Sequence, residues 1–227
     1  MTRVTEHLAA VTERIANAAE VAERDNDSVA LLAVSKRHST DSIRAVAAAG
    51  QRAFGENYVD EGVAKILELR ELGLEWHFIG PIQSNKTKQI AAHFDWVHTV
   101  DRTKIVRRLS EQRPEARAPL NTCIQVNIDD EAQKAGANIE DVPTIAEMIE
   151  NAPGLRLRGL MCLPKIREAR EQQREPFARL AKLFEELSQR HPNIDTLSMG
   201  MSGDLEAAII EGATVVRVGT AIFGQRD

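Results

Sequence analysis

A lysine that directly follows an aliphatic run is the first residue in this sequence that could do chemistry. Lys36 comes after the run 31–35, LLAVS, which has the composition of a buried strand. Apolar surroundings lower the pKa of a lysine and free its amine to attack an aldehyde. Lys36 is therefore a candidate for forming a Schiff base. The alternative interpretation is a solvated lysine at a strand end, with Arg37 as its neighbour.

Two segments further along the chain have the composition of a phosphate-binding site. The segment 197–204, LSMGMSGD, runs from a predicted strand into a predicted helix, with Ser202 near the junction. Another predicted strand ends at Gly219, which Thr220 follows. Glycines let backbone amides approach an anion, and hydroxyl groups add further donors. The alternative is ordinary local structure, with Ser202 as an N-cap and Gly219 as a turn residue.

Arg217 belongs to the same candidate site. It stands two residues before Gly219 and should point to the same side of its strand. A buried arginine needs a hydrogen-bond acceptor. That acceptor would be a carboxylate, such as that of Asp204 or Glu56, or an atom of a ligand.

A helix with one apolar stripe is predicted at the beginning of the chain. Polar residues separate apolar residues that recur at steps of three and four. The residues of the stripe are Leu8, Val11, Ile15, Ala18 and Ala22.

Short β-type segments then alternate with longer helical patterns. The predicted strands span 29–35, 53–57, 76–80, 96–100, 122–127, 155–163, 196–200 and 215–219. The predicted helices span 40–49, 59–72, 85–92, 102–112, 139–151, 177–189 and 204–211, and we interpret 165–175 as a surface loop or helix start. Strands that are aliphatic at nearly every position are typical of parallel sheets covered on both faces. Eight such units predict an α/β fold, a closed (β/α)₈ TIM barrel with an extra N-terminal helix, as a single domain over residues 1–227.

The barrel prediction brings the candidate residues together. Functional residues of such barrels lie at the carboxyl ends of the strands, and the loops after strands seven and eight commonly bind phosphate. Both glycine-containing segments fall at those loops, which favours a phosphate-bearing ligand. An open doubly wound sheet is the weaker alternative, because no GxGxxG follows the first strand.

The composition of the chain disfavours several classes of function. The chain has 227 residues, 43% of them hydrophobic, and a formal net charge of -5, which disfavours binding to nucleic acid or to an anionic membrane surface. Cys123 and Cys162 lie in apolar runs without a metal-ligand spacing, so we expect two buried, unpaired thiols. No signal peptide or membrane span is visible, so a cytoplasmic location is expected.

Five linked motifs resemble one known family. They are AVSK at 33–36, FGENY at 54–58, WHFIG at 76–80 with QSNK at 83–86, LSMGMSGD at 197–204, and VRVGT at 216–220 with IFG at 222–224. Together they resemble the YggS/PROSC family of pyridoxal phosphate homeostasis proteins, in the same order and over nearly the whole chain. That family is similar to the barrel domain of alanine racemase and binds pyridoxal 5'-phosphate (PLP) without known catalytic turnover.

The resemblance implies a role for each candidate residue. Lys36 would hold PLP as a Schiff base, Arg217 would hydrogen-bond the pyridine nitrogen, and Asn57 would lie near the phenolic oxygen. The phosphate would be bound by Ser202, Gly219 and Thr220, together with the amide of Met201. The implied partners are PLP itself and PLP-dependent apoenzymes as recipients, and the protein is expected to be a monomer.

The chemistry favours a carrier over an enzyme. Arginine does not release its proton, so Arg217 at the pyridine nitrogen makes the ring a poor electron sink. A racemase also needs a second base, which the related racemases take from an additional domain not expected here. Tyr58, the only tyrosine, is expected to pack rather than to act as that base. The alternatives are a PLP-dependent amino acid racemase or lyase, and a class I aldolase in which Lys36 attacks a phosphorylated sugar.

Overall fold

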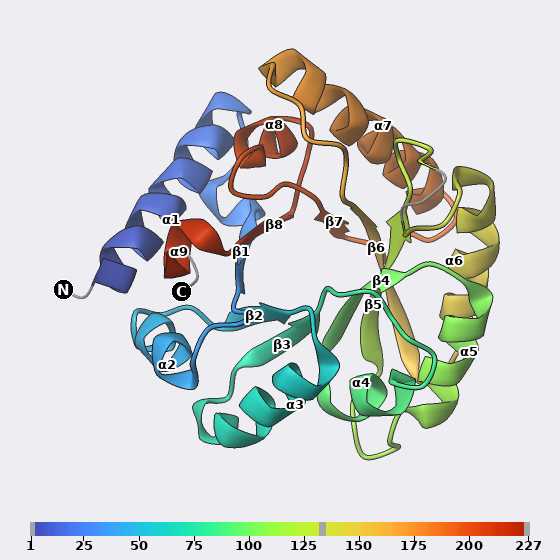
Figure 1. Cartoon of the computed structure of the whole chain (residues 1–227). Helices are drawn as coiled ribbons and strands as arrows, with labels where there is room; N and C mark the ends of the chain where they lie inside the picture. The colour runs from blue at the N-terminus through green and yellow to red at the C-terminus, as the bar shows by residue number, and fades with distance from the viewer. Residues whose placement is uncertain (1–2, 132–134, 225–227) are drawn as a thin grey trace.

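Eight parallel strands close into a barrel, in which each strand pairs with its neighbours in sequence order and β8 returns to β1 (Figure 1). The computed structural model describes residues 3–131 and 135–224. The strands are β1 Ala30–Val34, β2 Ala53–Glu56, β3 Glu75–Phe78, β4 Trp96–Val100, β5 Leu120–Val126, β6 Leu155–Cys162, β7 Thr196–Ser198 and β8 Val215–Val218. The predicted TIM barrel and its eight strands are confirmed.

The helices surround the barrel (Figure 1). They are α1 Arg3–Val21, α2 Thr40–Ala48, α3 Val59–Glu68, α4 Thr87–His93, α5 Thr103–Gln112, α6 Val142–Glu150, α7 Arg170–Ser188, α8 Leu205–Ile210 and α9 Thr220–Phe223, with 3-10 turns at Asn26–Ser28, Arg70–Leu72 and Ile139–Asp141. Two details differ from the prediction. α7 begins at Arg170 rather than at 177, because the charged residues of its first turns face solvent and carry no apolar period. The single helical turn α9 lies after the last predicted strand, outside the helices predicted from the sequence.

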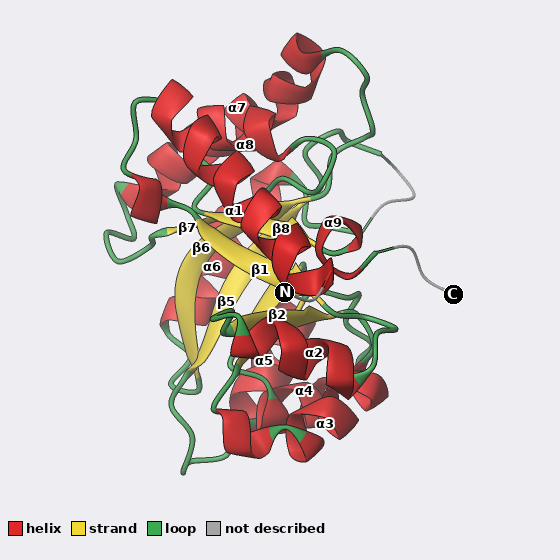
Figure 2. Ribbon diagram, turned by 90° about the vertical axis from the view of Figure 1, so that its left-hand side faces the viewer, coloured by secondary structure: helices red, strands yellow, loops and turns green. Residues whose placement is uncertain are grey.

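The predicted stripe of the N-terminal helix packs against the rest of the protein. Leu8, Val11, Ile15 and Ala18 are buried, whereas Ala22 follows the end of α1 and is partly exposed. α1 lies beside α8 and α9, next to the barrel wall at β8 (Figure 2). The extra helix thus covers the outside of the last βα units.

Polar contacts from α1 reach the loops that carry the candidate phosphate site. Arg14 donates from Nη2 to the carbonyl oxygen of Ser202 at 3.0 Å, and from Nε to Glu206 of α8 at 2.8 Å. The ring of His7 lies 3.2 Å from the carbonyl oxygen of Ile222 in α9. α1 therefore helps to fix both loops.

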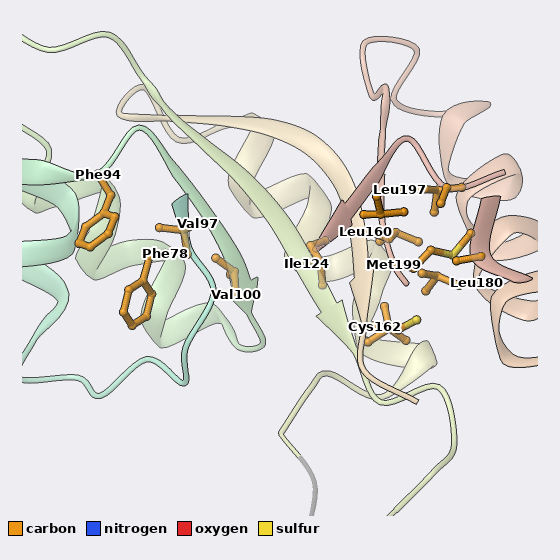
Figure 3. Packing of buried hydrophobic residues seen from close by; sticks show 14 of the residues in the cluster. Phe78, Phe94, Val97, Val100, Ile124, Leu160, Cys162, Leu180, Leu197 and Met199 are labelled. Carbon is orange, nitrogen blue, oxygen red and sulfur yellow. The ribbon is translucent and has the colours of Figure 1, made fainter. Parts of the chain in front are cut away.

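The larger part of the core lies between the strands and the helices. Phe78 of β3 and Phe94 after α4 pack edge to face with ring centroids 5.4 Å apart, while Ile124 and Leu160 pack on neighbouring strands beside the helices (Figure 3). Cys162 belongs to the same core, and burial raises the pKa of its thiol to about 12. No helix in the described part of the chain is both long and apolar enough to cross a bilayer.

The inside of the barrel contains polar residues among apolar ones. Leu32 and Ile79 belong to one small apolar cluster, and Cys123, with its thiol buried and its pKa raised to about 12, belongs to another. The buried rings of His77 and His98 lie 2.8 Å apart, from Nδ1 to Nε2. Burial holds the pKa of His98 well below its ordinary value, and the neighbouring His77 and Arg217 act in the same direction. His98 is therefore neutral in the folded protein.

Stability should fall as the pH drops below about 6.5, the ordinary pKa of histidine. The depressed pKa of folded His98 means that the unfolded chain takes up a proton that the folded protein excludes. The loss should reach about 1.4 kcal/mol per pH unit. Urea unfolding at a series of pH values measures the slope, which His98→Asn should reduce. His7→Asn, at a partly exposed histidine of α1, is the control, and equal slopes in His98→Asn and wild type would contradict the prediction.

Candidate functional site

A cavity of about 680 Å³ opens at the carboxyl ends of the strands. All seven residues predicted for the site line it, namely Lys36, Asn57, Met201, Ser202, Arg217, Gly219 and Thr220. They come from the ends of β1, β2, β7 and β8. The structure thus brings together residues that lie up to 184 positions apart, from Lys36 to Thr220.

A buried lysine, Lys65, holds the turn that carries Lys36 by hydrogen bonds. Lys65 of α3 donates to the carbonyl oxygen of Ser35 at 2.7 Å. Glu61, also on α3, accepts hydrogen bonds from Lys65 and from the backbone N–H of Arg37. These bonds hold the residues on either side of Lys36, which is itself half-buried in the turn after β1.

A buried ion pair anchors Lys65. Its ammonium lies 2.8 Å from Oε1 of Glu56, which has no exposed surface and also accepts from the hydroxyl of Ser35 at 2.6 Å. Burial raises the pKa of Glu56, while Lys65 and Ser35 act in the opposite direction. The pair is an internal support of the lysine turn, and neither member lines the cavity.

Arg217 is buried in the barrel wall and also lines the cavity. Nη1 donates to Oγ of Ser198 at 2.8 Å, and Nη2 donates to the carbonyl oxygen of Cys162 at 2.9 Å. The carboxylate partners considered from the sequence, Asp204 and Glu56, make no hydrogen bond with it. Because a guanidinium has five N–H donors, Arg217 keeps donors for a ligand in the cavity beyond the two hydrogen bonds that it makes with described residues.

Asn57 has an incomplete set of hydrogen bonds. Its Oδ1 is buried and has no partner among the described residues. Buried polar atoms are rarely left without a partner in native proteins, and such cases occur at sites that a ligand completes. The main chain of Asn57 is held closely against Gly80, where an added Cβ would come within 2.0 Å of the Asn57 carbonyl oxygen. Asn57 therefore combines a fixed backbone with an unsatisfied side chain.

The loops after β7 and β8 form the other end of the cavity. At Gly203 an added Cβ would meet no atom within 4 Å, so this backbone is open to an approaching group. Ser202, Gly219 and Thr220 lie around the same space. The amide of Met201 differs from the expectation, because it donates to the Asp204 carboxylate at 2.6 Å.

Other lining residues were not predicted. Ile79, Gln125, Met161, Leu163 and Ile166 are among them, and the last of these is 96% exposed at the rim. Strand-end positions could have indicated several of them, but apolar residues there look like core in a sequence.

Tyr58 lies outside this cavity. Its hydroxyl accepts from Nη2 of Arg37 at 3.0 Å, on an exposed part of the surface. Among the lining residues that the structure describes, Lys36 and Arg217 are therefore the ionisable ones. A cavity with one amine, one guanidinium, an unsatisfied amide and an open loop backbone suits a ligand with an aldehyde, a ring acceptor and an anionic group.

The sequence model of the alanine racemase N-terminal domain matches residues 7–227. A pyridoxal phosphate homeostasis protein of Pseudomonas aeruginosa is 55% identical over 227 residues, which cover 100% of this chain and 97% of the relative. The protein of the same name from Escherichia coli is 49% identical over 230 residues, covering 100% and 98%. The chain belongs to the pyridoxal phosphate homeostasis protein family. The sequence resemblance is thereby confirmed.

Solved structures agree with membership of the pyridoxal phosphate homeostasis protein family. PipY of Synechococcus elongatus, in a structure with PLP bound, is 36% identical with a TM-score of 0.85, and the match covers 98% of this chain and 100% of that one. Alanine racemase from Corynebacterium glutamicum is 16% identical with a TM-score of 0.67, and the match covers 62% of its length. At that identity the similarity is one of fold alone.

Proposed function

We propose that this chain binds PLP in the cavity at the carboxyl ends of its strands, as a single barrel domain, and serves PLP homeostasis in the cell. The observation that carries the proposal is the composition of the cavity, in which Lys36 and Arg217 are the ionisable lining residues described. Membership of the family, and the PLP bound to PipY, support the same ligand.

The residues of the cavity fit PLP group by group. Lys36 supplies an amine that adds to an aldehyde carbon, and loss of water then leaves a Schiff base. Arg217 offers N–H donors to the ring nitrogen, and the unsatisfied amide of Asn57 suits the phenolic oxygen. The phosphate is assigned to Ser202, Gly219 and Thr220 beside the open backbone, with Met201 contributing its side chain to the wall because its amide is engaged.

The same arrangement favours a carrier without catalytic turnover. PLP supplies an electron sink when its ring nitrogen is protonated, and a permanently protonated Arg217 cannot give up a proton to it. The lining residues that the structure describes contain no second base opposite Lys36. The rim is open, with Ile166 exposed, which suits exchange of PLP with apoenzymes. We assign this exchange to a monomer in the cytoplasm.

Lys36→Ala should abolish the covalent attachment of PLP. Wild-type protein mixed with PLP should develop a yellow absorption band, and borohydride reduction followed by peptide mass analysis should locate the adduct on Lys36. The matched control is Lys86→Ala, which removes a lysine paired with Asp60 outside the cavity and should keep the adduct. An adduct retained in Lys36→Ala would overturn the assignment. Solvent deuterium entering the α-carbon of an amino acid, and lost in Lys36→Ala, would identify a racemase or lyase instead.

A further inference from the structure

A continuous row of hydrogen bonds crosses the inside of the barrel. Arg217 of β8 donates to Oγ of Ser198 on β7 at 2.8 Å, and Nδ1 of His98 on β4 lies 2.8 Å from the same oxygen. Nε2 of His98 lies 2.8 Å from Nδ1 of His77 on β3, and Nε2 of His77 lies 2.8 Å from Oε1 of Glu75. Arg217 lines the large cavity, whereas Glu75 and His77 line a smaller hollow of about 240 Å³ among the first residues of the strands. The row thus links opposite ends of the barrel.

The carboxylate at one end sets the direction of the bonds along the row when each histidine carries one proton. A guanidinium can only donate, and an ionised carboxylate can only accept. The hydrogen bond from His77 holds the pKa of Glu75 below its usual range, so Glu75 is ionised. Burial keeps His98 neutral, with one donor and one acceptor nitrogen. When His77 also carries a single proton, the Ser198 hydroxyl must donate to Nδ1 of His98, and each histidine must carry its proton on Nε2.

The row also connects the positive charge of the buried Arg217 to a carboxylate. Arg217 makes no hydrogen bond with a carboxylate in the described residues, and Asp204 acts on it only through space. An uncompensated charge in a protein interior is costly. Successive hydrogen bonds polarise one another, so a carboxylate at one end stabilises a cation at the other. Arg158 of β6 lines the same small hollow as Glu75 and also acts on its charge, but Arg158 is already paired with Asp195 at 2.6 Å.

We propose that Ser198, His98, His77 and Glu75 are positioning residues that orient Arg217 in the cavity and balance its charge from the opposite end of the barrel. The inference rests on the proposed function, in which Arg217 meets the ring nitrogen of PLP. It adds that a carboxylate at the far end of the barrel influences the bound cofactor without touching it. The family resemblance and the cavity composition do not depend on this row.

The positions of the imidazole protons, which give the donor and acceptor of each bond in the row, can be measured without PLP. Long-range ¹H–¹⁵N spectra of the imidazole groups in the PLP-free protein distinguish the two neutral tautomers. We expect the proton of both His77 and His98 on Nε2. A proton on Nδ1 of either ring would mean that the hydrogen bonds do not run from donor to acceptor toward Glu75. It would overturn the inference, whatever ligand the protein binds.

The influence on the cofactor is tested at Glu75, because this residue lies away from the cavity. Glu75→Ala should weaken PLP binding roughly three- to tenfold, the effect of one lost hydrogen bond, and shift the absorption maximum of the bound cofactor. Glu75→Gln keeps an acceptor and should recover part of both effects. The control is Glu71→Ala, which removes another carboxylate that is bonded to Arg44 outside the barrel and should match wild type.

The outcomes separate this inference from the proposed function. Wild-type binding of PLP, with unchanged affinity and spectrum in Glu75→Ala, would overturn the inference and leave the proposed function standing. Wild-type protein that takes up no PLP would overturn the proposed function and, with it, the influence on the cofactor. Should Glu75→Ala fail to fold, Glu75→Gln and the tautomers of the wild-type protein still decide the question.

Discussion

Replacing Lys65 by methionine should destabilise the folded protein by about 3 to 5 kcal/mol, because it leaves Glu56 as a buried carboxylate without its cation. Glu56 is fully buried, its Oε2 already has no partner among the described residues, and Lys65 lies 2.8 Å from Oε1. The substitution also removes the donor to the Ser35 carbonyl oxygen, next to Lys36. Urea unfolding at neutral pH measures the loss.

The pH dependence of that loss identifies its cause. Burial raises the pKa of Glu56, so its protonated form is favoured in the folded state, and removal of Lys65 strengthens this preference. A carboxyl group whose folded pKa is raised stabilises the fold at low pH and loses that contribution as the pH rises through the folded pKa. The deficit of Lys65→Met should therefore be largest at neutral pH and should shrink as the pH falls.

Two further variants control the experiment. Lys65→Met combined with Glu56→Leu removes both charges and should recover most of the stability, since apolar replacements of buried ion pairs are often neutral. Lys86→Met breaks a more exposed pair with Asp60 and should cost no more than about 1 kcal/mol. If Lys65→Met and Lys86→Met cost the same, the interpretation of the Glu56 pair is wrong.

Gly80→Ala should be the second damaging change, with a loss of about 3 kcal/mol or more, at the upper end of overpacking effects. The new Cβ would lie 2.0 Å from the Asn57 carbonyl oxygen and 2.8 Å from its Cα, and backbone atoms cannot avoid it by changing rotamer. Asn57 must move, so PLP binding should weaken together with stability. Thermal unfolding and PLP titration of the same variant measure the two effects.

Gly203→Ala provides the matched comparison for Gly80→Ala. This glycine also belongs to the cavity, but an added Cβ there meets no atom within 4 Å. Its stability should stay within about 0.5 kcal/mol of wild type, as for most surface substitutions. A stable Gly80→Ala variant with unchanged PLP binding would mean that the β2 and β3 ends separate more easily than the packing indicates.

Local patterns in the sequence were sufficient to predict the barrel. Strands with aliphatic residues on both faces, such as 122–127, and helices with a clear 3.6-residue period were located within a few residues. α7 was placed too late because Pro176 and the charged residues before it resemble a loop, although the helix continues through Pro176. A helical turn made of charged, solvent-facing residues lacks the apolar periodicity by which a helix is identified in a sequence.

In the candidate site, too, some residues could be predicted from local patterns and others could not. Lys36 and Gly219 could be predicted because strand-end residues of a barrel share one face, whatever their separation in the chain. The supports behind them could not be predicted. Lys65 stands four residues after Glu61 and resembles an exposed helical ion pair, yet it is buried. The contact between His98 and Ser198 joins residues 100 positions apart and depends on the registration of distant strands, which no local pattern contains.

The contacts of α1 also determine when the candidate site can form during synthesis. Arg14 leaves the ribosome long before its partners, because Ser202 lies 188 residues later and Glu206 lies 192 residues later. A nascent chain that has reached only β6 has none of the loops assigned to the phosphate, and its first helix lacks α8 and α9, against which it finally packs. Because chains fold as they emerge, α1 can complete its docking only after the last units have emerged. The pocket is therefore completed only after α8 and α9 emerge, so a ligand that needs both loops binds after the last units of the barrel have folded.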